Sequence, residues 1–133
     1  MWLLKTEPST YSDDDLEREG GTTWDGVKNP AALRNLAAMK VGDLVVIYHT
    51  GDEKSAVGLA EVTKAAYPDP KSRNSKLVVV DLKSKGRLAR PVTLSEMRTL
   101  PEFATSPLLR QGRLSVVPLT AAQWKRLTGG APR

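Results

Sequence analysis

Short segments rich in β-branched residues, joined by brief polar connections, most constrain what this chain can fold into. Residues 44–49 (LVVIYH) are apolar at almost every position, which is typical of a strand buried on both faces. Residues 50–54 are polar and contain Gly51, so they predict a hairpin that returns as a strand over 56–62. Because long alternation of strands and helices is absent, a doubly wound parallel sheet is disfavoured. We predict an α+β fold, a small, mostly antiparallel β-barrel surrounded by short helices.

The remaining strands and helices are marked by their ends. Strands are predicted at 2–4, 77–82, 87–92 and 113–117, and the arginines and proline of 87–92 favour a sheet edge. Helices are predicted after capping residues at 12, 29, 93 and 120, with a single helical turn at 107–112. A length of 133 residues fits one domain, and no linker or repeat divides the chain. We therefore expect a single domain over 1–133, with 129–133 as a flexible tail.

Composition excludes several kinds of site. The chain has no cysteine, which excludes disulfides and thiolate zinc sites and fits the cytosol. No apolar run approaches the roughly 18 residues of a membrane span. The only histidine, His49, has no cysteine or second histidine near it in sequence that would complete a metal site or triad, which favours a structural role. We predict no cofactor, no metal site, no catalytic residue, no membrane association, and a cytoplasmic location (the nucleoid, or the nucleus in a eukaryote).

Charge is divided unevenly along the chain. Residues 1–69 carry 7 Lys or Arg and 12 Asp or Glu, whereas residues 70–133 carry 13 and 3. Such a basic half favours a polyanionic partner, nucleic acid above all. A solvated basic face without a partner is the alternative. The cations expected to follow a phosphate backbone are Lys71, Arg73, Lys76, Arg87 and Arg90.

Residues 22–30 (TTWDGVKNP) place an aromatic ring directly before a turn and a helix start. The dipeptide at 25–26 is a turn signal, and the dipeptide at 29–30 caps and opens a helix. A helix start offers free N–H groups and partial positive charge, so Trp24 is well placed to hold a planar or anionic ligand. The alternative interpretation is a core tryptophan beside an ordinary loop.

Eight short motifs, in order along almost the whole chain, resemble the motif series of the EVE domain family. Any one of them is a weak signal, but eight in register are specific. They are residues 2–8 (WLLKTEP), 24–29 (WDGVKN), 38–43 (AMKVGD), 48–50 (YHT), 58–62 (GLAEV), 66–70 (AYPDP), 90–92 (RPV) and 110–116 (RQGRLSV). The family belongs to the PUA-like superfamily, with YTH and ASCH domains as relatives. The resemblance implies a PUA-like β-barrel whose pocket accepts a modified nucleobase, either modified cytosine in DNA or a modified base in RNA.

The resemblance also assigns pocket residues where the motifs match. It implies that the exit of the first strand lines one side, that Trp24 stacks on the base, and that the turn and helix start after it supply polar groups. Residues 48–50 would form the opposite wall, and the last strand the rim and floor. The implied set is Lys5, Thr6, Glu7, Trp24, Asp25, Gly26, Asn29, Tyr48, His49, Thr50, Arg110, Gln111, Arg113 and Ser115.

Two departures from the family pattern concern aromatic side chains. The family often has Tyr-Gln at positions 30–31, where this chain has Pro-Ala, and an aromatic residue near 75–76, where this chain has Ser-Lys. We therefore expect fewer aromatic walls around the base.

A nucleic-acid-binding module without catalysis fits these features best. An enzyme acting on a modified nucleotide is the first alternative, because Lys5, Glu7 and His49 could form an acid–base set. A protein-binding accessory barrel is the second.

Overall fold

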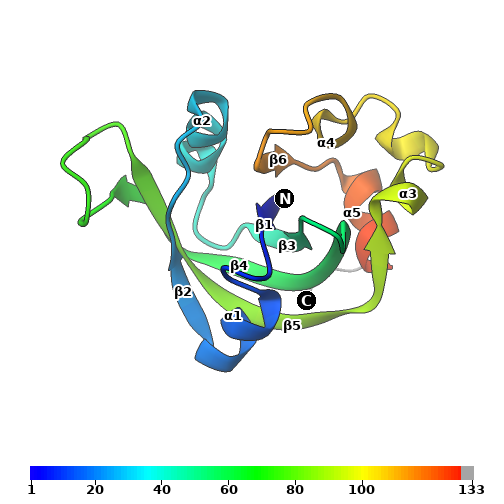
Figure 1. Cartoon of the computed structure of the whole chain (residues 1–133), viewed down its shortest axis with the longest axis horizontal. Helices are drawn as coiled ribbons and strands as arrows, with labels where there is room; N and C mark the ends of the chain where they lie inside the picture. The colour runs from blue at the N-terminus through cyan, green and yellow to red at the C-terminus, as the bar shows by residue number, and fades with distance from the viewer. Residues whose placement is uncertain (130–133) are drawn as a thin grey trace.

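One six-stranded, strongly curved sheet forms the centre of the described structure, and short helices lie around it (Figure 1). The structure is a computed structural model that describes residues 1–129. The strands are β1 (Trp2–Thr6), β2 (Gly21–Trp24), β3 (Leu44–His49), β4 (Ser55–Pro68), β5 (Val78–Thr93) and β6 (Val116–Pro118). The helices are α1 (Asp13–Glu19), α2 (Pro30–Ala38), α3 (Leu94–Met97), α4 (Pro107–Arg110) and α5 (Ala121–Thr128), with a 3-10 turn η1 (Pro101–Phe103).

Strand pairing gives the sheet its curl. Its order is β2-β5-β4-β3-β1-β6, in which β1 runs parallel to β3 and the other four pairs are antiparallel. The long strands β4 and β5 pass through several register shifts, which bend them around the core. Helix α2 packs against β6 at one edge of the sheet and against β4 and β5 towards the other. The prediction of a mostly antiparallel α+β fold with short surrounding helices is confirmed.

Four strands differ clearly from the predictions, of which β6 begins at Val116 and not at the expected position 113. β4 continues past the expected 56–62 as far as Pro68, and the segments expected at 77–82 and 87–92 are one strand, β5. β2 is not predicted, because its four residues include a glycine and follow the glycine that ends α1. For β2, β4 and β5, pairing supplies the strand, since β4 and β5 pair along their length and β2 pairs with 80–83 of β5.

The helices start where the capping residues predict. The Ser12 hydroxyl accepts from the Asp15 N–H, and the Asp15 carboxylate accepts from the Ser12 N–H, which is a capping box at α1. Asn29 Oδ1 accepts from two N–H groups in the first turn of α2. Thr120 and Gln123 form a second capping box at α5. At the other end of α5, Gly129 is the C-cap, and residues 130–133 of the expected tail lie outside the described part of the chain.

Helix α1 is fixed to the sheet by a close contact. Gly58 in β4 lies against the carboxyl group of Asp13, so that a Cβ atom at position 58 would overlap that carboxyl. Asp13 is fully buried, neither of its carboxyl oxygens has a hydrogen-bond partner among the described residues, and burial raises its pKa. The Asp13 N–H donates to His49 Nε2 at 2.9 Å. Because Nε2 accepts, the ring proton is on Nδ1, which lies 2.6 Å from Glu53 Oε2.

Among residues 1–129, no helix is long and apolar enough to cross a bilayer.

Candidate functional site

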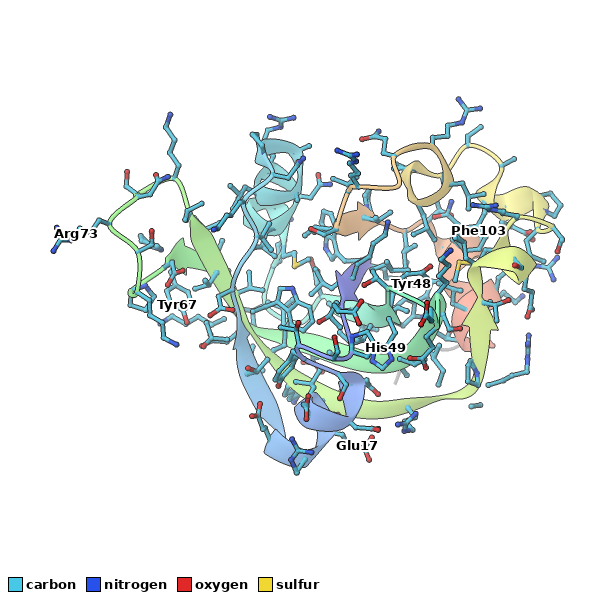
Figure 2. All side chains as sticks on the ribbon, in the orientation of Figure 1. Glu17, Tyr48, His49, Tyr67, Arg73 and Phe103 are labelled. Atoms are coloured by element: carbon cyan, nitrogen blue, oxygen red, sulfur yellow. The ribbon has the colours of Figure 1, made fainter. Side chains whose placement is uncertain are left out.

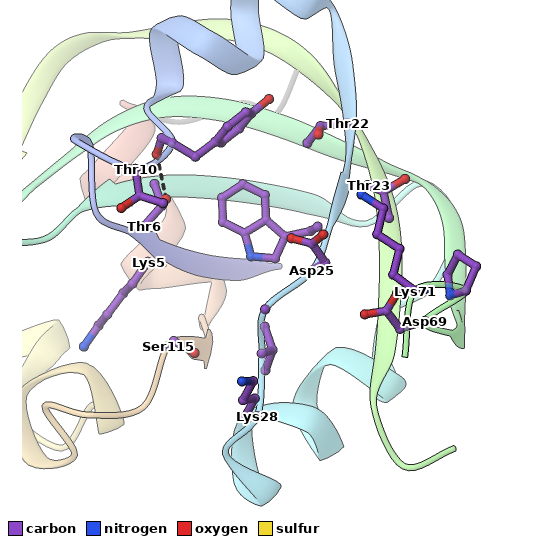
Figure 3. Close-up of a pocket in the computed structure, with 15 residues that line it drawn as sticks. Lys5, Thr6, Thr10, Thr22, Thr23, Asp25, Lys28, Asp69, Lys71 and Ser115 are labelled. Carbon is purple, nitrogen blue, oxygen red and sulfur yellow. Dashed lines mark hydrogen bonds between the residues drawn. The ribbon is translucent and has the colours of Figure 1, made fainter. Parts of the chain in front are cut away.

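A pocket of about 740 Å³ lies between β1, β2 and the loop after β4 (Figure 3). Its residues come from five separate parts of the sequence. They are Lys5, Thr6, Thr10, Tyr11, Thr22, Thr23, Trp24, Asp25, Gly26, Val27, Lys28, Asp69, Pro70, Lys71 and Ser115. The pocket therefore exists only because β1, β2 and β6 are brought together around the curl of the sheet.

Two aromatic rings form a corner of the pocket. Trp24 at the end of β2 and Tyr11 just before α1 meet edge to face, with ring centroids 6.1 Å apart and planes at 85°. The Tyr11 hydroxyl donates to Glu19, and burial together with this bond raises the pKa of Tyr11 to about 12, so the phenol stays neutral. Trp24 is only 7% exposed and belongs to the main core cluster. It is thus both a core residue and part of the pocket lining.

Hydroxyl and charged groups complete the lining. The hydroxyls belong to Thr6, Thr10, Tyr11, Thr22, Thr23 and Ser115, and the charged groups to Lys5, Asp25, Lys28, Asp69 and Lys71. Figure 3 shows Lys5 and Lys71 on opposite sides of the pocket, with Asp25 between them. The Thr6 hydroxyl is held at 2.6 Å from the Tyr11 carbonyl. The pocket thus offers an aromatic face, donors and acceptors, and one more positive than negative charge.

Lys5 connects this pocket to a smaller hollow. Its side chain lines both cavities. Its Nζ donates to the Gly112 carbonyl at 3.0 Å and lies 5.9 Å from the centre of the Tyr48 ring. The side chain is half-buried, and this burial lowers the pKa of Lys5. An ammonium group that has lost part of its water shell is well placed to receive an anion.

The structure brings part of the predicted base-binding set into the larger pocket. The residues that line it are Lys5, Thr6, Trp24, Asp25, Gly26 and Ser115. Tyr48 and Thr50 line the neighbouring hollow instead. Arg110, Gln111 and Arg113 are exposed after or at the end of α4 and line neither cavity.

Three further residues of that set make contacts of their own. Glu7 is exposed and accepts from Ser9 and Thr50. The Asn29 side-chain oxygen caps α2. His49 is buried, and both its ring nitrogens are engaged by the contacts to α1 and Glu53 described above. None of the three lines either cavity.

The cations predicted to follow a phosphate backbone divide into two groups. Lys71 lines the pocket, and Arg73 and Lys76 are exposed in the same loop, with Arg73 pointing outwards (Figure 2). Arg87 is paired with Asp14, and Arg90 makes two hydrogen bonds of 2.8 Å to Glu96. Among the ion pairs of residues 1–129, none involves the three loop cations, whereas each of the two strand arginines has a carboxylate partner.

Several lining residues were missed by the sequence analysis. They are Thr10, Tyr11, Thr22, Thr23, Val27, Lys28, Asp69 and Pro70. A signal existed for most of them, because residues 22–28 flank Trp24 and the motif at 66–70 is part of the resemblance. Tyr11 had no such signal. It supplies the second aromatic wall, which neither position 30–31 nor position 75–76 provides. Residues 1–129 contain no group of three or more His, Asp or Glu side chains arranged to hold a metal ion.

Comparisons with known proteins cover nearly the whole chain. The family model of the EVE domain matches residues 1–129. Thymocyte nuclear protein 1 of Rattus norvegicus is 31% identical over 157 aligned positions, which cover 92% of this chain and 70% of that protein. The NMR structure of Rpa0253 from Rhodopseudomonas palustris has a TM-score of 0.90 at 41% identity, covering 96% of this chain and 90% of that one. The crystal structure of human THYN1 in complex with 5-methylcytosine containing DNA has a TM-score of 0.84 at 28% identity, covering 96% and 95%.

Proposed function

Since this chain belongs to the EVE domain family, we propose that it binds nucleic acid and holds one modified nucleobase in the Trp24 pocket without transforming it. The similarity to human THYN1, which was solved with DNA containing 5-methylcytosine, makes that base in DNA the first candidate. A modified base in RNA is the second candidate.

The observation that carries this proposal is the composition of the pocket. A base taken out of its strand needs a stacking face, and stacking on an aromatic side chain contributes roughly 1–3 kcal/mol. Trp24 and Tyr11 form such a corner. The pocket's volume of about 740 Å³ leaves room for a base with its sugar.

Polar groups around the corner match the edge of cytosine. Asp25 is an acceptor for the exocyclic amine, and hydroxyls and Lys5 are donors for the ring nitrogen and carbonyl oxygen. A methyl group would be read by apolar contact with Trp24 and Val27, which contributes about 0.8 kcal/mol for one buried carbon. We therefore expect a preference of about fourfold for the methylated base from this contact alone.

A panel of oligonucleotides tests the proposal directly. Single-stranded and duplex DNA, and single-stranded RNA, would carry either an unmodified base or one modified base at the same position. Fluorescence anisotropy would give the affinity for each. We expect one modified base to be preferred over its unmodified parent in the same sequence. Equal affinity for every modified and unmodified pair would reject the base-binding pocket.

Catalytic turnover is not expected. The three residues that could form an acid–base set do not share a cavity: Lys5 lines the pocket, whereas Glu7 and His49 line neither cavity. The protein and a bound modified oligonucleotide would be incubated for many hours and the strand analysed by mass spectrometry. We expect the strand to be recovered with unchanged mass. A deaminated, demethylated or cleaved product would instead establish an enzyme.

The loop of residues 71–76 is expected to follow the phosphate backbone. The affinity for a single strand falls as the salt concentration rises. On a plot of log affinity against log salt, each phosphate that a cation neutralises makes the slope steeper by roughly 0.7. Changing Lys71, Arg73 and Lys76 together to alanine should flatten this salt dependence and weaken all sequences alike, because phosphate contacts carry no base information.

A matched control removes the same charge elsewhere. Lys40, Lys83 and Lys125 are exposed and line neither cavity. Their triple alanine variant should retain most of the wild-type salt slope. If both triple variants give the same slope, the loop contributes only to net charge and does not contact the strand.

A further inference from the structure

We propose that the smaller hollow beside the base pocket binds the sugar and phosphate of the nucleotide adjoining the inserted base. This inference rests on the proposed function, because it places the backbone of the same bound strand. It assigns a ligand class to the second cavity and names Lys54 and Arg98 as the cations that hold the phosphate, with Lys5, which lines both cavities, between the base and the phosphate.

The position of the hollow suits a neighbouring nucleotide. Its volume is about 190 Å³, roughly a quarter of the base pocket, and Lys5 lines both cavities. Lys5 is therefore where a strand whose base enters the larger pocket would reach the hollow. The apolar side chains in its lining, Leu94, Leu108 and Leu109, together with Tyr48, offer a surface for the carbons of a sugar.

The charges at the rim suit a phosphate. Three cations line the hollow, and none of them has a carboxylate partner among the ion pairs of residues 1–129. Arg90 and Arg126, by contrast, are each held by a glutamate at 2.8 Å. Four carboxylates are close to the lining in sequence or by contact: Glu7, Asp52, Glu53 and Glu96. Glu7 accepts from the Thr50 hydroxyl at 3.2 Å, Glu53 lies against His49, and Glu96 is held by Arg90. None of the four lines the hollow, so the charged side chains in its lining are all cations.

The backbone at Lys54 supports the same role. Lys54 has φ of 45°, the only positive φ of a residue other than glycine within the described chain. Side chains adopt this region at a cost, so such positions persist where the surroundings impose them and are found at binding sites. The Lys54 carbonyl accepts from the Leu94 N–H at 2.8 Å, which ties the hairpin after β3 to the start of α3. That contact holds two of the hollow's walls together with Lys54 at their junction.

Neutral phosphate analogues give a sharp test. A short single-stranded DNA with one 5-methylcytosine would be made in a series, each member carrying a neutral methylphosphonate at one linkage near that base. For wild-type protein we expect one linkage whose neutralisation weakens binding about fivefold. In Arg98→Gln, the fully charged strand should bind about fivefold more weakly, and neutralising that linkage should cause little further loss. The salt slope of this variant should fall by roughly 0.7.

Two more variants separate binding from folding. Lys54→Gly removes the side chain at a backbone position that glycine adopts freely, so its melting temperature should not fall although its affinity does. Lys125→Gln is the control: it removes one positive charge, as Arg98→Gln does, at an exposed position on α5 that lines neither cavity. Each methylphosphonate should weaken binding to this variant as much as it weakens binding to the wild type.

The outcomes distinguish this inference from the proposed function. In one outcome, each methylphosphonate weakens binding to Arg98→Gln and Lys54→Gly as much as it weakens binding to the wild type, and the modified base is still preferred. The hollow is then not a phosphate site, and the base pocket stands. If the coupling to one linkage is found but modified and unmodified bases bind equally, the phosphate site stands and the base-reading function falls. If no strand binds at low salt, both are rejected.

Discussion

Replacing Trp24 by alanine is expected to lower the free energy of unfolding by about 3–5 kcal/mol, the usual cost of removing a buried tryptophan. Trp24 is 7% exposed, belongs to the core cluster and meets Tyr11 edge to face, so the change leaves a cavity and an unsupported ring. In a domain of this size such a loss should lower the melting temperature by more than about 10 °C. Urea and thermal denaturation would measure it.

The same variant should lose its preference for a modified base. Where the protein is still folded, removal of the stacking face should weaken binding by roughly 1–3 kcal/mol. Because loss of stability alone could weaken binding, Trp24→Phe is the more informative variant. It keeps an aromatic ring, so it should keep most of the stability while its preference for the modified base is reduced. Trp124→Phe makes the same change at a buried site that lines neither cavity, and should leave the preference intact. A folded Trp24→Ala protein with full base preference would exclude Trp24 as the stacking residue.

Gly58→Ala should destabilise the protein by about 3 kcal/mol or more. The added methyl group would overlap the buried carboxyl of Asp13. Neither side can easily yield, because Gly58 is paired with β3 on one side and β5 on the other, and Asp13 is fixed at the start of α1. Since Tyr11 lies just before that helix, the displacement should also open the aromatic corner of the pocket.

A double-mutant cycle tests the cause of this loss. In the double variant Asp13→Ala, Gly58→Ala the clash is gone, so much of the stability should return, with a coupling of about 0.5–3 kcal/mol. Gly112→Ala is the matched control, since a Cβ atom there meets nothing within 4 Å and should change stability by less than about 0.5 kcal/mol. Urea unfolding of the four proteins decides the matter: strictly additive losses would mean that Gly58 is required for a reason other than the Asp13 contact.

Much of the local structure could be predicted because its causes lie within a few residues. Ser12, Asn29 and Thr120 cap their helices through bonds that span two or three positions. β3 could be predicted as a strand buried on both faces, because such burial leaves a continuous apolar run within the strand itself. The turn at 25–26 preceding α2 is likewise local, and Gly26 has φ of 80°.

The lining of the Trp24 pocket could be predicted only in part. The stretch around Trp24 drew attention to one wall, and six of the fourteen implied residues line the cavity. Tyr11 could not be identified, because it faces Trp24 only once α1 has docked on β4 through Asp13 and Gly58. Cations that look alike in the sequence also have different surroundings in the fold. Arg90 is held by Glu96, whereas Lys71 lines the pocket.

The helix starts, the buried strand β3, the basic second half and the place of Trp24 before a turn could all be predicted from the amino-acid sequence. The parallel pairing of β1 with β3, the length of β4 and β5, and the position of Lys5 between two cavities could not, because they arise only on folding. The difference lies in the sequence separation of the residues that interact. Caps and burial patterns depend on neighbours a few residues away, whereas strand pairing and pocket lining depend on residues tens of positions apart, which meet only when the sheet has curved around its core.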